Sequence, residues 1–277
     1  MINKPKEFIY SHSEYKLGIW QYLKLNYYLY LLKKGYSAAC IVKNKEFYGL
    51  NFYVNKDVLI PRPDTEMLVE ASANRIRNRN EKISLVDVGT GSGCIPVAII
   101  TSINQKIPKG SLWDSKSKKQ PTNLIDVIAT DISKKALKVA RRNAKKHKVD
   151  INFLQGSLLG PVFKKYNLQN YSSIIITANL PYLTDEQFKN EPSIQREPKL
   201  ALIADKSGLA LYEKLLEQIK KLTDYNLQIT TFFEIDPSQT TQITKLIKKN
   251  LPGAKINIIQ DLAGKNRVVK IEIRLKS

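Results

Sequence analysis

The sequence predicts an α/β protein whose seven strands form one mostly parallel, Rossmann-like sheet. Short apolar runs alternate with segments of helical periodicity over most of the chain, a pattern typical of parallel strands joined by crossover helices. A glycine-rich stretch at residues 89–93 directly follows the first of these runs, as in the ligand-binding loops of open sheets. The last two apolar runs are joined only by residues 261–267. Because so short a link cannot make a parallel crossover, we expect an antiparallel C-terminal hairpin.

The elements of this core follow from the same patterns. We expect strands at residues 85–88, 124–130, 151–155, 173–178, 227–235, 255–260 and 268–275. We expect helices at residues 66–77, 94–103, 134–148, 209–222 and 237–250. Asp64 or Thr65 is a candidate cap for the first of these helices. In helix 134–148, Leu137, Ala140 and Ala144 share one side, which predicts that this side packs on the sheet.

A short helical segment is expected in residues 1–50, and residues 51–277 are expected to form the main domain. Apolar and aromatic residues are dense in residues 14–32. Residues 33–35, Lys-Lys-Gly, predict the end of this helix. We expect the helix to be buried against the main domain, with a helix that lies on a membrane surface as the alternative.

Two other segments have predictions of their own. Residues 51–59 alternate between apolar and polar types, which predicts a short hairpin. Residues 104–122 are polar, rich in Lys, and contain Pro and Gly. This composition predicts a surface loop inserted into the main domain.

The composition indicates a globular, cytoplasmic protein. Hydrophobic residues make up 43% and charged residues 25% of the chain, which excludes a disordered or fibrous protein. No apolar run approaches the roughly 20 residues that span a bilayer, and the first residues lack a signal-peptide pattern. Cys40 and Cys94 lie far apart, so we expect neither a disulfide framework nor a metal site. We also expect no membrane contact and a monomer.

The charge is strongly positive and has two interpretations. There are 45 basic and 25 acidic residues, for a formal net charge of +20. Such a field attracts nucleic acid or a ribosome. The other interpretation is a coding bias that spreads solvated lysines over the whole surface. Helix 134–148 carries eight Lys or Arg residues and no acid, which fits a nucleic-acid stripe or an ordinary solvated face.

The glycine-rich stretch is the first candidate for chemistry. It reads Asp87-Val88-Gly89-Thr90-Gly91-Ser92-Gly93. Glycine is needed where a chain turns sharply or where its backbone approaches a ligand closely. Placed between a strand and a helix, the loop can present backbone N–H groups to a cofactor. The stretch resembles motif I of class I methyltransferases, and this resemblance implies S-adenosylmethionine as the cofactor.

Asp131 ends the next expected strand and is the second candidate. An acid at this place typically accepts hydrogen bonds from ribose hydroxyls, usually about 20 residues after the glycine loop. Here the separation from Gly89 is 42 residues, and the insertion at 104–122 accounts for the excess. A helix N-cap is the alternative role, for which Ser133 is also a candidate.

Asn179-Leu180-Pro181-Tyr182 follows the strand expected at residues 173–178 and is the third candidate. It resembles the Asn/Asp-Pro-Pro-Tyr motif of methyltransferases that act on planar nitrogens. The lone pair of an amide or aryl-amine nitrogen is delocalised, so this nitrogen is a poor nucleophile. The Asn side-chain oxygen and the next carbonyl can accept its two N–H protons and orient it. Tyr182 can lie against a planar group.

Further segments resemble the HemK/PrmC family of release-factor glutamine methyltransferases. They are residues 46–52, residues 58–66 (Val-Leu-Ile-Pro-Arg-Pro-Asp-Thr-Glu), residues 197–202 with 207–209, and residues 261–269. The resemblance extends over about residues 44–275. It implies methyl transfer from S-adenosylmethionine to the side-chain amide of the Gln in the Gly-Gly-Gln motif of peptide chain release factors.

The resemblance also implies roles for individual residues. The implied cofactor-binding residues are Asp87, Gly89, Thr90, Gly91, Ser92, Gly93, Asp131, Ser157, Leu158 and Asn179. The implied catalytic and substrate-binding residues are Asn179, Leu180, Pro181 and Tyr182, with Arg62 as a further substrate-binding residue. Arg62 and Thr65 either shape the rim of the pocket or serve the scaffold, and both readings stay open.

The sequence departs from the family pattern in three places. Leu180 stands where the family has its first proline, and Asn-Leu-Pro-Tyr is also the form found in ribosomal RNA adenine dimethylases. Ser157 stands where the family has Asp, so a charge-assisted hydrogen bond to the cofactor is lost. The N-terminal helical segment, which in the family helps to hold the release factor, is short. N6-adenine methylation of ribosomal RNA or DNA is therefore the alternative function.

Overall fold

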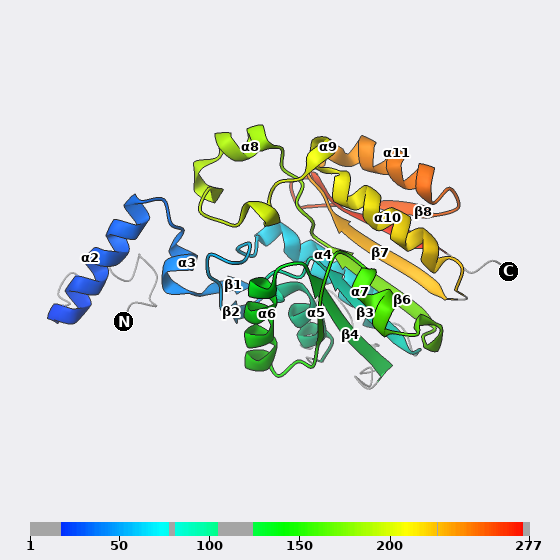
Figure 1. The fold of residues 1–277 in the computed structure, drawn as a ribbon, viewed down its shortest axis with the longest axis horizontal. Helices are drawn as coiled ribbons and strands as arrows, with labels where there is room; N and C mark the ends of the chain where they lie inside the picture. The colour runs from blue at the N-terminus through cyan, green and yellow to red at the C-terminus, as the bar shows by residue number, and fades with distance from the viewer. Residues whose placement is uncertain (1–17, 78–80, 105–123, 226, 274–277) are drawn as a thin grey trace.

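The structure, a computed structural model, describes residues 18–77, 81–104, 124–225 and 227–273. Its centre is a seven-stranded sheet with the order β5-β4-β3-β6-β7-β9-β8 (Figure 1). The strands are β3 (Ile83–Val88), β4 (Ile125–Asp131), β5 (Asn152–Gln155), β6 (Ser173–Ala178), β7 (Gln228–Glu234), β8 (Lys255–Gln260) and β9 (Asn266–Ile273). The first five are parallel to one another. The last two form the expected antiparallel hairpin, with β9 inserted between β7 and β8.

Helices cover both faces of the sheet and bury its central strands β3, β6 and β7 on both sides (Figure 1). One face packs against α4 (Glu66–Arg77), α5 (Cys94–Asn104) and α6 (Lys134–His147). The other packs against α7 (Gly160–Lys165), α10 (Ala210–Leu222) and α11 (Thr240–Asn250). Neighbouring residues of β3 show the alternation, since Leu85 joins the first of these cores and Val86 the second. The expected class I, Rossmann-like α/β fold is confirmed.

The hairpin expected at residues 51–59 lies earlier in the chain. β1 (Lys45–Phe47) and β2 (Leu50–Phe52) pair antiparallel. Tyr48 and Gly49 form the turn between them, both with positive φ, as a tight two-residue hairpin turn requires. Phe47 and Phe52 are buried in the core shared by α4 and α5. The Tyr48-Gly49 turn indicates which residues pair in this hairpin. The alternation of apolar and polar residues predicted the hairpin too far along the chain.

The first described helix, α2 (Ile19–Lys33), ends as expected just before Gly35, whose φ is positive. The expectation that it is buried was wrong, because α2 contains no buried residue. Trp20 is 81% exposed and Tyr27 is 58% exposed. Apolar residues occur all around this helix, so it has no single apolar stripe to lay on a core. It lies at one end of the molecule, joined through α3 (Ala38–Val42) (Figure 1).

Two short helices not expected from the sequence lie after the strand ends at the functional edge. They are α8 (Asp185–Asn190) and α9 (Asp205–Gly208). Thr184 and Gln187 form a capping box at the start of α8, a signal that the sequence contains. No described helix is long and apolar enough to cross a bilayer. The loop expected at 104–122 falls almost wholly outside the described residues.

Candidate functional site

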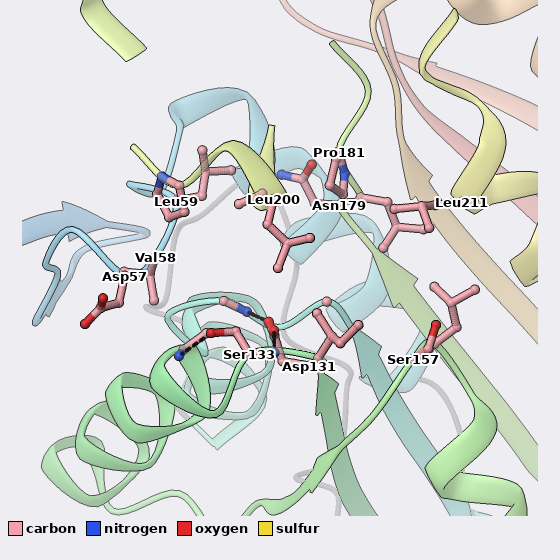
Figure 2. A pocket seen from close by; sticks show the side chains of 18 of the residues that line it. Asp57, Val58, Leu59, Asp131, Ser133, Ser157, Asn179, Pro181, Leu200 and Leu211 are labelled. Atoms are coloured by element: carbon pink, nitrogen blue, oxygen red, sulfur yellow. Dashed lines mark hydrogen bonds between the residues drawn. The ribbon is translucent and has the colours of Figure 1, made fainter. Parts of the chain in front are cut away.

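A cavity lies at the carboxyl edge of the sheet, where β3, β4, β5 and β6 end side by side (Figure 2). Asp131 and Ser133 lie on one side, and Leu59, Leu200 and Pro181 face them from the other. Of the residues proposed from the sequence, eight line it: Gly89, Gly91, Asp131, Ser157, Leu158, Asn179, Leu180 and Pro181. The remaining ones, which are Asp87, Thr90, Ser92, Gly93, Tyr182 and Arg62, are not among the lining residues.

Backbone hydrogen bonds to β4 hold the start of the glycine loop. The N–H groups of Gly89 and Thr90 both donate to the Thr130 carbonyl, each at 2.9 Å. Gly89, Gly91 and Gly93 all have positive φ, a conformation that other residues rarely adopt. The loop therefore turns back sharply at the end of β3, and its backbone forms part of the cavity wall.

Asp87 supports this loop from beneath. It is fully buried, and its Oδ1 accepts a hydrogen bond of 2.6 Å from the Thr177 hydroxyl. Burial raises the pKa of the Asp87 carboxyl to about 6, although hydrogen bonds from Thr177 and Thr90 oppose the shift. Thr90 and Ser92 are buried as well. These three residues therefore lie beneath the loop, whereas Gly89 and Gly91 line the cavity.

Gly93 and Asn143 join the loop to α6. A Cβ on Gly93 would lie 3.1 Å from the Ala140 Cβ and 3.2 Å from its Cα, so the close approach of α6 needs a glycine. Asn143, wholly buried, donates to the carbonyls of Ser92 and Tyr53 and accepts from the Tyr53 N–H. Asn143 was not predicted from the sequence, where its only signal is a polar residue on the apolar side of an expected helix.

Asp131 uses both carboxylate oxygens to fix backbone. Oδ2 accepts from the Gly91 N–H at 2.9 Å, and Oδ1 accepts from the Ser133 N–H at 2.8 Å. Burial raises the pKa of Asp131, and these two hydrogen bonds oppose the rise. Ser133 caps α6 by accepting from the Ala136 N–H. A carboxylate has lone pairs left for ligand hydroxyls after two such bonds, and Asp131 lines the cavity.

Gly156, Ser157 and Leu158 form the edge of the cavity beyond β5. Gly156 has φ +152, and a Cβ there would lie 2.4 Å from the Pro161 Cγ, so this turn also requires glycine. Leu158 has a positive φ of 52°, a conformation that a leucine adopts only at a cost. Ser157 is exposed at the rim, where its hydroxyl can reach a ligand.

The loop Asn179 to Tyr182 is held by hydrogen bonds at Asn179, Leu180 and Tyr182. Asn179 Nδ2 donates to the Thr65 Oγ1 at 3.1 Å. The Leu180 N–H donates to the hydroxyl of buried Tyr212, which donates in turn to the Glu234 carbonyl. At the other end, Gln239 Nε2 donates to the Tyr182 carbonyl at 3.3 Å. The loop is therefore braced before any substrate arrives.

Thr65 was expected either to cap α4 or to shape the pocket, and no capping hydrogen bond from its side chain is present in the described structure. Its hydroxyl instead accepts from Asn179, and the residue is 2% exposed. Leu180, at the position of the family's proline, is 3% exposed. Its Cδ2 lies 3.1 Å from where a Cβ on Gly89 would be, so the leucine packs directly on the glycine loop.

Arg62 forms an ion pair instead of lining the cavity. Its Nη2 lies 2.5 Å from Oε1 of Glu197, and Glu197 Oε2 accepts from the Ile60 N–H at 3.0 Å. The carboxylate is almost wholly buried. The pair ties residues 60–62 to the segment that follows the Asn179 loop, and these two segments supply the outer wall of the cavity.

The contacts that form this outer wall were not predicted from the sequence, although the segments that supply them resemble the family. Its lining residues are Asp57, Val58, Leu59, Pro198, Leu200 and Ala201. A small apolar cluster of Phe188, Ile194 and Leu202 packs with Leu59 and Leu183 and holds it in place. Pairings between loops of this kind leave no periodic pattern in a sequence.

The cavity suits an adenosyl cofactor by its donor set and shape. Backbone with positive φ at Gly89 and Gly91, a carboxylate at Asp131 and an apolar Leu158 surround one space. Within the described residues, no group of three His, Cys, Asp or Glu side chains is placed to hold a metal ion. The arrangement can bind a cofactor through the glycine loop and present a substrate nitrogen to Asn179.

Comparison with known proteins agrees with this geometry. No protein-family model matches the chain. It is 34% identical over 252 residues to the release factor glutamine methyltransferase of Mycoplasma mycoides subsp. mycoides SC, covering 90% of this chain and 81% of that protein. It is 34% identical over 242 residues to the one from Bacillus subtilis, covering 86% and 75%. The N-terminal domain of human METTL16, solved in complex with SAH, has a TM-score of 0.52 at 12% identity, with 86% and 80% covered.

The sheet order, the glycine loop and the Asn-Leu-Pro-Tyr loop define a class I methyltransferase. Within that class the extended similarity to the curated relatives is decisive, because it covers most of both chains. The chain belongs to the family of release factor glutamine methyltransferases, as its resemblance to HemK/PrmC predicted.

Proposed function

We propose that this enzyme transfers a methyl group from S-adenosylmethionine to a release factor in the cytoplasm. The acceptor is the side-chain amide nitrogen of the Gln in the Gly-Gly-Gln motif. The single observation that carries the proposal is the orientation of Asn179, whose Nδ2 is bound to Thr65 at the edge of the cavity. The names of the curated relatives support the same acceptor.

The chemistry follows from what these groups can accept. With Nδ2 engaged, the Asn179 Oδ1 is free to accept one N–H of a substrate amide, and the Leu180 carbonyl can accept the other. Two acceptors fix the plane of the amide and polarise its N–H bonds, which favours attack by the nitrogen, and one N–H proton is lost as the N–C bond forms. When bound, the cofactor supplies an electrophilic sulfonium methyl. Leu180 serves here as well as proline because the acceptor is a backbone carbonyl.

Cofactor binding is assigned to the residues around the glycine loop. Gly89 and Gly91 offer close backbone approach, Asp131 offers a carboxylate for ribose hydroxyls, and Ser157 with Leu158 borders the outer end. Asp87, Thr90, Ser92 and Gly93 contribute by holding the loop. The METTL16 domain that shares the fold was solved with SAH, which is consistent with this assignment.

Substrate binding is assigned to the wall on the other side. Pro181 lines the cavity directly. Tyr182, which is half-buried, follows it and completes the pocket. Arg62 contributes through its ion pair with Glu197, which holds the outer wall against the site.

The acceptor is tested by following tritium from methyl-labelled S-adenosylmethionine. The purified chain is incubated with a release factor, and separately with ribosomal RNA. We expect label in the release factor that resists ribonuclease and falls about 10²- to 10³-fold with Asn179→Ala. Label confined to RNA would reject the proposal and favour adenine methylation.

A further inference from the structure

A buried polar group lies behind the Asn179 loop and has no part in lining the cavity. It consists of Thr65, just before α4, and Glu234, the last residue of β7. They are 2% and 3% exposed. Strand β7 pairs with β6, and Phe233 stands opposite Ala178. Glu234 and Asn179 therefore stand side by side at the ends of adjacent strands.

The contacts of this group centre on the Asn179 side chain. Asn179 Nδ2 donates to Thr65 Oγ1 at 3.1 Å. Within the described part of the chain, Glu234 Oε2 has no partner at hydrogen-bonding distance. The Thr65 hydroxyl and the Asn179 amide nevertheless lie near enough to lower the pKa of Glu234 as donors. Glu234 therefore brings a buried carboxylate oxygen without its own partner to the strand end beside Asn179.

The donor and acceptor capacities of these groups couple their orientations. A carboxylate can only accept, whereas a threonine hydroxyl has one proton and two lone pairs. If the Thr65 proton is directed to Glu234, Thr65 offers only lone pairs to its other neighbour. Asn179 must then turn its NH2 toward Thr65, as observed, and its Oδ1 away. The two ends of an amide are nearly equal in shape, so the hydrogen-bond partners decide which end faces which neighbour.

We propose that Thr65 and Glu234 are positioning residues that fix the side-chain orientation of Asn179, so that its oxygen and not its nitrogen faces the substrate amide. Glu234 determines where the Thr65 hydroxyl donates its proton, and Thr65 in turn determines which end of the Asn179 amide faces it. The inference rests on the proposed function, because an acceptor is needed only if the substrate brings N–H groups.

The ionisation of Glu234 gives the arrangement a pH dependence. Burial raises the pKa of Glu234 to about 7, and the Asp64 charge adds to this, while Thr65, Arg267 and Asn179 oppose it. The titratable or charged groups that face Glu234 are Asp64, Arg267, Tyr182, Tyr212 and Cys94. A protonated Glu234 can donate to Thr65 and so release the constraint. Turnover should therefore decline as the pH falls below about 7.

The kinetic test uses three variants and one control variant of the full chain with an intact release factor and S-adenosylmethionine. We expect Thr65→Val to lower kcat by up to about 10²-fold without changing the Kd for S-adenosylmethionine. Thr65→Ser keeps the hydroxyl and should retain most of the activity. Glu234→Gln should lower kcat and remove the decline below pH 7. Thr244→Val, which removes a hydroxyl bound to the Thr240 carbonyl in α11, is the matched control and should leave kcat unchanged.

A second readout needs no release factor. In 15N-labelled full chain, the Asn179 side-chain NH2 resonances are identified by their loss in Asn179→Ala. We expect them to titrate near pH 7, and to shift in Thr65→Val but not in Thr244→Val. If the wild type methylates no release factor, the proposed function fails, and these resonances still decide the orientation of Asn179. Unmoved resonances in Thr65→Val, or parallel losses of kcat and cofactor affinity, would overturn the inference.

Discussion

Asp131 joins two parts of the proposed cofactor site through single hydrogen bonds. Its oxygens hold the Gly91 and Ser133 N–H groups, and hydrogen bonds to a charged group contribute about 1.5–3 kcal/mol each. We therefore expect Asp131→Ala to weaken S-adenosylmethionine binding by about 10- to 100-fold, measured by calorimetry. Asp150→Ala, at an exposed position after α6, is the control. An unchanged Kd in Asp131→Ala would remove this residue from the site.

Glu234 makes the stability of the enzyme depend on pH. Its folded-state pKa is about 7, against a usual 4.5, so the folded protein holds this proton more tightly than the unfolded chain does. The resulting stabilisation is complete below about pH 4.5 and is lost as the pH rises through 7. Glu234→Gln carries no charge at any pH. The variant should thus gain stability relative to the wild type between pH 5 and pH 8, on the order of a few kcal/mol.

This prediction is measured by urea unfolding of both proteins at the two pH values. A difference in the free energy of unfolding that stays constant with pH would contradict the raised pKa.

Glu234 could have been noticed in the sequence as a candidate site residue. It is an acidic residue at the end of an apolar strand, Phe-Phe-Glu at 232–234. This placement indicates a buried carboxyl group, and buried titratable groups are frequent at functional sites.

At the scale of elements, the Asn179 loop depends on the segment before α10. Gly208 has φ +81, and a Cβ there would lie 2.0 Å from the Tyr182 carbonyl oxygen. Gly208→Ala must therefore push the loop away, and we expect kcat to fall by up to about 10²-fold together with a lower Tm. Gly253→Ala is the matched control, because its Cβ would meet no atom within 4 Å. Equal kinetics in both variants would show that the loop does not rely on this contact.

The strands and helices of the core could be predicted because each is specified locally. β3 and β6 are short, mostly apolar segments that are buried along their whole length, and α6 has one apolar side. The glycine loop was predictable because positive φ limits the choice of residue. The contact of Thr65 with Asn179 joins residues 114 positions apart, and nothing in the local pattern of either residue specifies it. Such contacts arise only when the sheet has brought its strand ends together.

At the scale of the whole molecule, we propose that the main domain begins at the β1–β2 hairpin, just before Lys45. Phe52 is 0% exposed in its core, whereas Trp20 in α2 is 81% exposed. We expect Phe52→Ala to lower the free energy of unfolding by about 3–5 kcal/mol. Trp20→Ala and Tyr27→Ala in α2 should each change it by less than about 0.5 kcal/mol. A large loss in either α2 variant would show that this helix belongs to the same folding unit.

The whole account depends on one nitrogen becoming methylated. The most direct measurement is tandem mass spectrometry of a release factor after incubation with the enzyme and S-adenosylmethionine. We predict a single added methyl on the Gln of the Gly-Gly-Gln fragment, strongly reduced with Asn179→Ala and absent when that Gln is replaced by Glu in the release factor. A methyl group at any other residue, or an unmodified fragment from an enzyme that binds the cofactor, would contradict the account.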